Sequence, residues 1–213
     1  MSRRHFLAMW LAALLPIGAR AHDGHGGGHE GHGGKPAPSP GPSAQEVPYE
    51  DPSRTYFTDL PVLDQRGESR RFYTDLLKDR IVLISFFYTS CPDFCPFMMD
   101  KLARVRGLLG PRVGKDIHFV SISVDPEQDT PERLRAFARS FEITDGWDLI
   151  TGKKENIDYI TYRLGQYTET AESHTTLLLA GNVAARRWIK LRPDSTEPQI
   201  ATWLRDLSGD GSS

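Results

Sequence analysis

The chain has 213 residues, with 26 lysines and arginines against 28 aspartates and glutamates. This near-neutral balance argues against a general nucleic-acid-binding protein, because such proteins carry an excess of basic residues. The two cysteines exclude a scaffold of several disulfides, and they exclude a zinc site built from cysteines alone, which needs four thiolates.

The first 21 residues have the pattern of an export signal peptide. Two arginines open the segment, an apolar run covers Phe6–Ala19, and Ala19–Ala21 offers a small-x-small cleavage site. The apolar run of about 14 residues is shorter than the roughly 20 that span a bilayer as a helix. Residues 2–7 resemble the twin-arginine export consensus, and the general secretory route stays open. We expect an exported protein, periplasmic or on the outer face of the cytoplasmic membrane, with an uncleaved membrane anchor as the alternative.

A tract rich in histidine and glycine follows at residues 22–34. Its seven glycines argue against a packed structure, because burial cannot offset the entropy of ordering them. Imidazole suits copper, zinc and nickel, so the tract is either a secondary metal-capture segment or a solvated linker. The histidines concerned are His22, His25, His29 and His32. The prolines that follow predict an extended spacer, so we expect residues 22–55 to be a disordered tail and linker.

From residue 56 to 208 the chain alternates strand-like and helix-like stretches. Apolar, β-branched runs predict buried strands over 81–88 and 117–124, and apolar spacings of three and four predict a helix over 94–109. Further elements are expected as a helix from Asp129 or Thr130, a strand over 147–150, a helix over 155–164, strands over 175–179 and 185–191 with a turn at Gly181-Asn182, and a helix over 200–207. This alternation predicts an α/β domain with a central mixed sheet flanked by helices, followed by a disordered end over 209–213.

The only cysteines, Cys91 and Cys95, fall between the first buried strand and the helix after it. Two cysteines four residues apart share one face of a wound helix, and the amides of its first turn are expected to lower the thiol pKa there. Three interpretations stay open: a structural disulfide, a redox dithiol acting on partners, and a metal site. Thiolates select Cu(I) or zinc, so a metal site would need a further ligand. His174 in a polar stretch before a strand, His118 in an apolar strand pattern, the tail and an acid are the candidates.

Several motifs resemble one known family. The run Cys-Pro-Asp-Phe-Cys-Pro at residues 91–96, placed after a strand, looks like the metal-binding motif of the Sco (SenC) copper chaperones. Residues 120–131 contain Asp-Pro-Glu-Gln-Asp-Thr-Pro, which is similar to the family's Asp-Pro-Glu-x-Asp-Thr-Pro signature, and Trp147 with the residues after it also fits. His174 falls where the family has its copper-binding histidine. The resemblance covers roughly residues 56–208.

The resemblance implies a thioredoxin-like fold that binds copper, as Cu(I) or Cu(II), through Cys91, Cys95 and His174. It implies a role in assembling the dinuclear copper centre of cytochrome c oxidase, by delivering copper or by reducing the cysteines of that centre. The implied partners are the copper-bearing subunit of the oxidase and a periplasmic copper donor or thioredoxin-like reductant. The alternative is an exported thiol-disulfide oxidoreductase that delivers no copper, and a third interpretation is a peroxiredoxin-like peroxidase.

Two acids in the second motif have simpler interpretations than metal binding. Asp129 is expected to cap the helix that follows it, with Thr130 as the competing cap. Asp125 is expected to shape the loop beside the cysteines.

Overall fold

The structure is a computed structural model that describes residues 51–92, 94–174 and 176–209. The predicted signal peptide, the four tail histidines and the last four residues of the chain lie outside the described residues. Within the described part, no helix is both long and apolar enough to cross a membrane.

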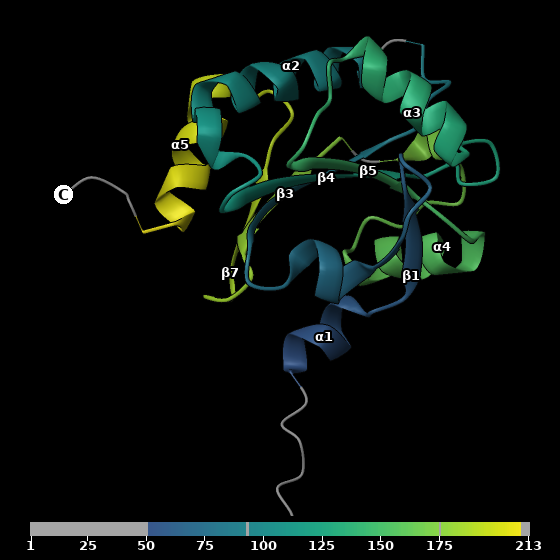
Figure 1. The fold of residues 1–213 in the computed structure, drawn as a ribbon, viewed down its shortest axis with the longest axis horizontal. Helices are drawn as coiled ribbons and strands as arrows, with labels where there is room; N and C mark the ends of the chain where they lie inside the picture. The colour runs from purple at the N-terminus through teal and green to yellow at the C-terminus, as the bar shows by residue number, and fades with distance from the viewer. Residues whose placement is uncertain (1–50, 93, 175, 210–213) are drawn as a thin grey trace, which may run out of the picture. The chain divides into compact units, whose positions relative to one another are not determined.

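Helices and strands alternate along the described residues, as the sequence pattern predicts (Figure 1). In chain order they are α1 (Pro52–Phe57), β1 (Pro61–Asp64), β2 (Ser69–Arg71), the π-helical turn η1 (Phe72–Leu77), β3 (Ile81–Phe87), α2 (Phe94–Leu109), the 3-10 turn η2 (Gly110–Arg112), β4 (Ile117–Ser123), α3 (Pro131–Ser140), β5 (Trp147–Thr151), α4 (Lys154–Arg163), the 3-10 turn η3 (Ala171–Ser173), β6 (Leu178–Asn182), β7 (Arg187–Leu191) and α5 (Glu197–Leu207).

The described strands form one seven-stranded sheet in the order β2-β1-β5-β4-β3-β6-β7. The central strands β3, β4 and β5 run parallel, whereas β6 pairs antiparallel with β3 and β1 pairs antiparallel with β5. The parallel strands are joined through α2 and α3, which are crossover connections of the kind that parallel pairing requires. The predicted mixed sheet is therefore confirmed.

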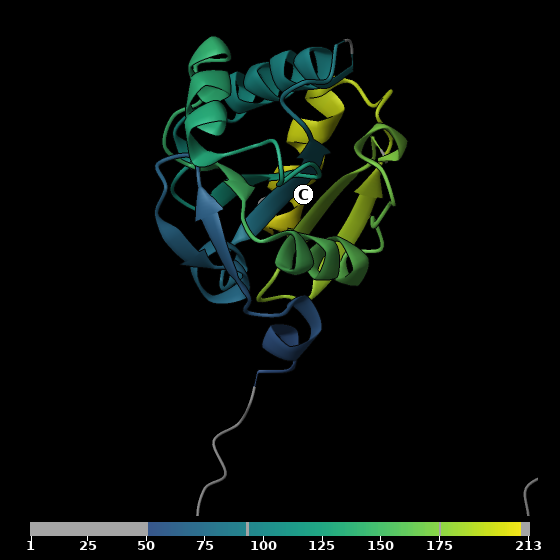
Figure 2. The same ribbon diagram turned by 90° about the vertical axis from the view of Figure 1, so that its right-hand side faces the viewer.

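Helices cover both faces of the sheet. Figures 1 and 2 show α2, α3 and α5 over one face and α1 and α4 over the other. Every side chain of β3 is buried, and successive residues face opposite sides: Leu83 packs in the core under α2, α3 and α5, whereas Val82 and Ile84 pack in the core above α4 and η1. A strand buried on both faces reads as a continuous apolar run, which explains why the sequence pattern located β3 well.

The first helix begins earlier than the prolines suggest. The sequence predicts folded structure from about Tyr56, but α1 begins at Pro52. Asp51 caps this helix by accepting a hydrogen bond from the Ser53 amide at 2.9 Å, and a proline in the first turn costs no hydrogen bond there. The spacer interpretation is therefore wrong for residues 51–55.

The last hairpin turns later than predicted. Gly181 and Asn182 belong to β6, and the turn lies beyond them, at residues 183–186. Gly181 serves a close contact instead of a turn: a Cβ on it would lie 2.4 Å from the ring of Trp188 on the paired strand β7. The glycine lets this ring lie flat against the sheet, so its presence in a strand has a packing cause.

Candidate metal centre

Both cysteines lie where β3 passes into α2. Cys91 is in the connecting loop and half-buried, whereas Cys95 is the second residue of α2 and only 1% exposed. The Cys91 amide donates to the Tyr88 carbonyl at 3.3 Å, and the Cys95 amide donates to the Cys91 Sγ at 3.4 Å. The structure has the two residues as thiols and not as a disulfide. Cys91 therefore lies at the accessible end of the pair and Cys95 at its buried end.

His174 reaches the same place from a distant part of the chain. It directly follows η3, and its ring Nδ1 lies 2.6 Å from the Ala171 carbonyl oxygen. A carbonyl can only accept, so Nδ1 carries the hydrogen of the neutral ring and Nε2 keeps a lone pair. Burial lowers the pKa of His174 and favours this neutral form. The imidazole is thus held in the tautomer in which Nε2 can bind a metal.

The remaining ring nitrogen is aimed at a cysteine. Nε2 of His174 lies 4.0 Å from Sγ of Cys95, 79 residues away in sequence. Bonds of about 2.3 Å to sulfur and 2.1 Å to nitrogen, opened to a trigonal angle, separate two such donors by about 3.8 Å. The observed separation is therefore within a few tenths of an ångström of the span that one metal ion requires. A thiolate with an imidazole suits Cu(I) or zinc.

Cys91, the third predicted ligand, is near Cys95 in sequence, but its side chain does not form a three-ligand metal site with Cys95 and His174. Among the described residues, no group of three or more histidine, cysteine, aspartate or glutamate side chains is close enough to hold a metal ion. Cys95 and His174 are brought together, whereas Cys91 lies in the loop before α2, with its Sγ accepting from the Cys95 amide at 3.4 Å. The two cysteines therefore do not share one face of a wound helix, contrary to the prediction from their spacing.

Burial reverses the expected shift of one thiol. The sequence predicts that the first helical turn lowers the thiol pKa, but the pKa of Cys95 is raised to about 12, chiefly because the side chain is desolvated. A metal ion would have to displace this proton, because thiolates and not thiols are metal ligands.

Tyr88 is a site residue that sequence reasoning missed. Its ring meets the His174 ring edge-on, with centroids 5.5 Å apart and an angle of 88° between the planes. Burial, and next the neighbouring Cys91, raises the pKa of Tyr88 to about 12. The Tyr88 side chain packs against the His174 ring on one side of the site and restricts the orientation of that ring. An aromatic residue directly after β3, three residues before Cys91, is the sequence signal that could have pointed to it.

The other candidate ligand, His118, lies at the far end of the sheet. It is half-buried in β4 and is paired in register with Val82, whereas the cysteine motif follows Phe87 at the opposite end of β3. Five residues of strand separate the two ends, or about 16 Å at 3.3 Å per residue. The interpretation of His118 as a packed strand histidine fits this placement.

One of the two acids in the second motif, Asp129, has a different role from the predicted one. Thr130 caps α3, because its hydroxyl accepts a hydrogen bond from the Arg133 amide at 3.4 Å. Asp129 is wrong as the predicted cap: it is fully buried and accepts hydrogen bonds from Thr89 and Ser123. The main-chain carbonyl of Asp125 accepts from the amide of Asp129 at 2.9 Å, and a loop-shaping role for the Asp125 side chain stays a prediction.

Comparison with known proteins identifies the family. The model of the SCO1/SenC family matches residues 55–182. The chain belongs to the SCO1/SenC family. A protein of Stutzerimonas stutzeri that is named for copper binding is 30% identical over 129 residues, covering 59% of this chain and 61% of the relative. For a SCO2-like protein of Rickettsia conorii the match covers 48% of each chain, so the chain matches about half of the length of its curated relatives.

Solved structures of the family share the fold. A SCO1/SenC family lipoprotein from Bacillus anthracis superposes with a TM-score of 0.61 at 25% identity, over 70% of this chain and 92% of that one. ScoI of Bradyrhizobium japonicum, solved with copper bound, superposes with a TM-score of 0.59 at 25% identity, over 69% and 96%. The predicted thioredoxin-like fold is thereby confirmed.

Proposed function

We propose that this SCO1/SenC protein is a copper-binding assembly factor for the dinuclear copper centre of cytochrome c oxidase. Copper would be held by Cys91, Cys95 and His174 and passed to the copper-bearing subunit, or the cysteines would keep the thiols of that subunit reduced. The observation that carries the proposal is the lone pair of His174 Nε2, fixed by the Ala171 carbonyl and directed at Cys95 Sγ. The family membership and the copper-bound relative support the choice of metal.

The three side chains would have different tasks in holding copper. His174 is neutral and anchored, so it offers a nitrogen donor without first losing a proton. Cys95 is buried and would contribute a thiolate once copper has displaced its proton. Cys91 is half-buried at the solvent side of the pair, and a partner's ligand would therefore reach copper beside Cys91 first. A soft site of two thiolates and one imidazole has few ligands to exchange when the metal is handed on.

The proposal places the protein outside the cytoplasm. The signal-like segment at residues 1–21 supports export to the periplasm or the outer face of the cytoplasmic membrane. The histidines of residues 22–34 would capture metal near the site as a secondary function. The donor of copper, or a thioredoxin-like reductant, would be found in the same compartment.

A thiol-disulfide oxidoreductase is the second candidate, and the unequal exposure of the two thiols supports it. The Cys91 thiolate would attack a partner disulfide and release one partner thiol. Cys95 would then attack the Cys91 sulfur of the mixed disulfide and release the second partner thiol. Two electrons pass to the partner, the pair ends as a disulfide, and a thioredoxin-like dithiol would reduce it again.

The test uses the full chain with its four tail histidines replaced by asparagine, here termed the tail variant. Competition with a chromogenic Cu(I) chelator should show one tightly bound copper per tail variant. His174→Ala in this background should weaken binding strongly, and His118→Ala, the matched control, should not. Equal binding by the two variants would remove His174 from the site. Reduction of a model disulfide that survives His174→Ala but not Cys91→Ser would favour the oxidoreductase.

A further inference from the structure

Asp129 is a fully buried carboxylate beside the candidate copper site. Its Oδ2 accepts hydrogen bonds from the Thr89 amide at 3.0 Å and from the Ser123 hydroxyl at 2.6 Å, and its Oδ1 accepts from the Thr89 hydroxyl. A buried carboxylate needs such donors, because a buried charge without hydrogen-bond partners strongly destabilises the folded state. Two of the three bonds come from Thr89, so the contacts that satisfy the acid also hold this residue in place.

Thr89 belongs to the loop that carries the first copper ligand. It lies two residues before Cys91, inside the turn that the Cys91 amide closes on the Tyr88 carbonyl at 3.3 Å. Both the amide and the hydroxyl of Thr89 are engaged by one carboxylate, so this residue can neither rotate nor shift without breaking those bonds. The backbone that leads to Cys91 is thus held from the side by a residue of another loop.

The holding residue is itself fixed by the fold. Asp129 stands between the end of β4 and the start of α3, and its amide donates to the Asp125 carbonyl at 2.9 Å. Ser123, the last residue of β4, is fully buried and pairs in register with Phe87 of β3. The carboxylate therefore spans from the rigid end of the parallel sheet to the ligand loop.

We propose that Asp129 is a positioning residue that sets the place of Cys91 in the copper site by holding Thr89. The inference rests on the proposed function, since it assigns a role towards the same three ligands. It gives the acid of the Asp-Thr-Pro sequence a task other than capping α3, which Thr130 performs. Residues that orient a ligand from outside the first coordination sphere typically change metal affinity about 10–100-fold when removed.

Geometry and charge can be separated at this position. In Asp129→Asn, the amide oxygen can take the place of Oδ2 and accept from the Thr89 amide and the Ser123 hydroxyl, while the amide nitrogen donates to the Thr89 hydroxyl, which can also accept. The asparagine thus keeps all three contacts without the charge. Asp129→Ala removes all three, and Thr89→Val removes the hydroxyl contact with little change of shape.

The experiment measures Cu(I) affinity by chelator competition in the tail variant, together with amide hydrogen exchange of residues 88–91 in the metal-free protein. We expect Asp129→Ala and Thr89→Val to lose affinity about 10–100-fold and to exchange faster in the loop. Asp129→Asn should restore both properties. Thr130→Ala, the matched control one residue away, should weaken α3 and leave both unchanged.

The inference would be overturned if Thr89→Val and Asp129→Ala had the same Cu(I) affinity and the same amide exchange in the loop as the control Thr130→Ala. An asparagine variant as weak as the alanine variant would also overturn it, because charge and not position would then matter. If Asp129→Ala does not fold, Thr89→Val decides alone. A parent protein that binds no copper at Cys91, Cys95 and His174 would instead refute the proposed function, and that result is distinct because no variant is needed to see it.

Discussion

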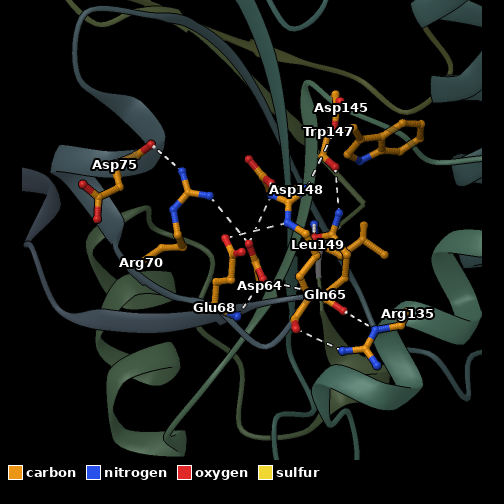
Figure 3. A network of polar contacts seen from close by, with 11 residues as sticks. Asp64, Gln65, Glu68, Arg70, Asp75, Arg135, Asp145, Trp147, Asp148 and Leu149 are labelled. Carbon is orange, nitrogen blue, oxygen red and sulfur yellow. Dashed lines mark hydrogen bonds and ion pairs between the residues drawn. The ribbon is translucent and has the colours of Figure 1, made fainter.

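Asp64 offers a quantitative test of what stabilises the turn between β1 and β2. Its side chain is fully buried at the end of β1, and Figure 3 shows it at the centre of a polar network with Arg70 and Asp148 nearby. Oδ1 accepts hydrogen bonds from the amides of Arg66 at 2.8 Å and Glu68 at 3.0 Å. Oδ2 lies 3.2 Å from the Arg66 guanidinium and 3.6 Å from that of Arg70.

The loss of stability expected for Asp64→Ala depends on which of its hydrogen-bond and ion-pair partners water can solvate instead. The side chains of Arg66 and Arg70 are 44% and 22% exposed, so water can solvate them again. Losing their ion pairs with Asp64 therefore contributes about 1 kcal/mol at most. The two amides are held in the turn after β1, and leaving them without an acceptor costs about 1 kcal/mol each or somewhat more. We therefore expect Asp64→Ala to lower the free energy of unfolding by about 2–3 kcal/mol.

Urea denaturation of the metal-free tail variant measures this change, with the slope against urea checked to stay constant. Asp64→Asn keeps one oxygen for both amides and should cost about 1 kcal/mol. Asp194→Ala is the matched control: Asp194 pairs with Arg192 but is 66% exposed, so its loss should stay within about 0.5 kcal/mol. A change for Asp64→Ala no larger than that of the control would refute the reasoning.

Three further predictions concern the fold and the thiols. Gly146→Ala should destabilise the protein by about 2–4 kcal/mol, because its Cβ would lie 2.4 Å from the backbone of the opposing loop. Gly110→Ala, also at positive φ but in open space, should cost about 1 kcal/mol, and equal losses of the two variants in urea denaturation would contradict this. Burial lowers the pKa of His118, so as pH falls below about 6.5 the unfolded chain takes up the proton first and stability declines towards pH 5; His118→Gln should flatten this decline, and an unchanged pH profile would refute the assignment. Iodoacetamide should modify Cys91 well before Cys95, as mass spectrometry of digests would show, because Cys95 is only 1% exposed; faster modification of Cys95 would contradict the order of burial.

The sequence predicts best the elements whose pattern is strong and continuous. The helix predicted over 94–109 coincides with α2, and the run over 81–88 coincides with β3 to within one residue. The strands β1 and β2 escaped prediction because they are short, and the three residues of β2 are polar and only partly covered. The turn was misplaced at Gly181 because a glycine that admits a ring looks like a turn glycine until Trp188 is placed beside it.

The sequence likewise predicts some residues of the candidate metal centre and misses others. The two cysteines are neighbours in sequence, so spacing alone predicts that they act together. His174 lies 79 residues beyond Cys95; the local pattern offered it as one of several candidate ligands, and only the family resemblance singled it out. The aromatic position before the cysteine motif hints at Tyr88, but the contacts of Tyr88 and Asp129 join loops that become neighbours only through sheet pairing, which no local pattern encodes.

X-ray absorption spectroscopy of the copper-loaded tail variant tests the central claim most directly. The account predicts one copper with two sulfur donors and one imidazole nitrogen, and it predicts loss of the imidazole signal in His174→Ala but not in His118→Ala. A coordination shell without sulfur, or an imidazole signal that persists in His174→Ala, would contradict it.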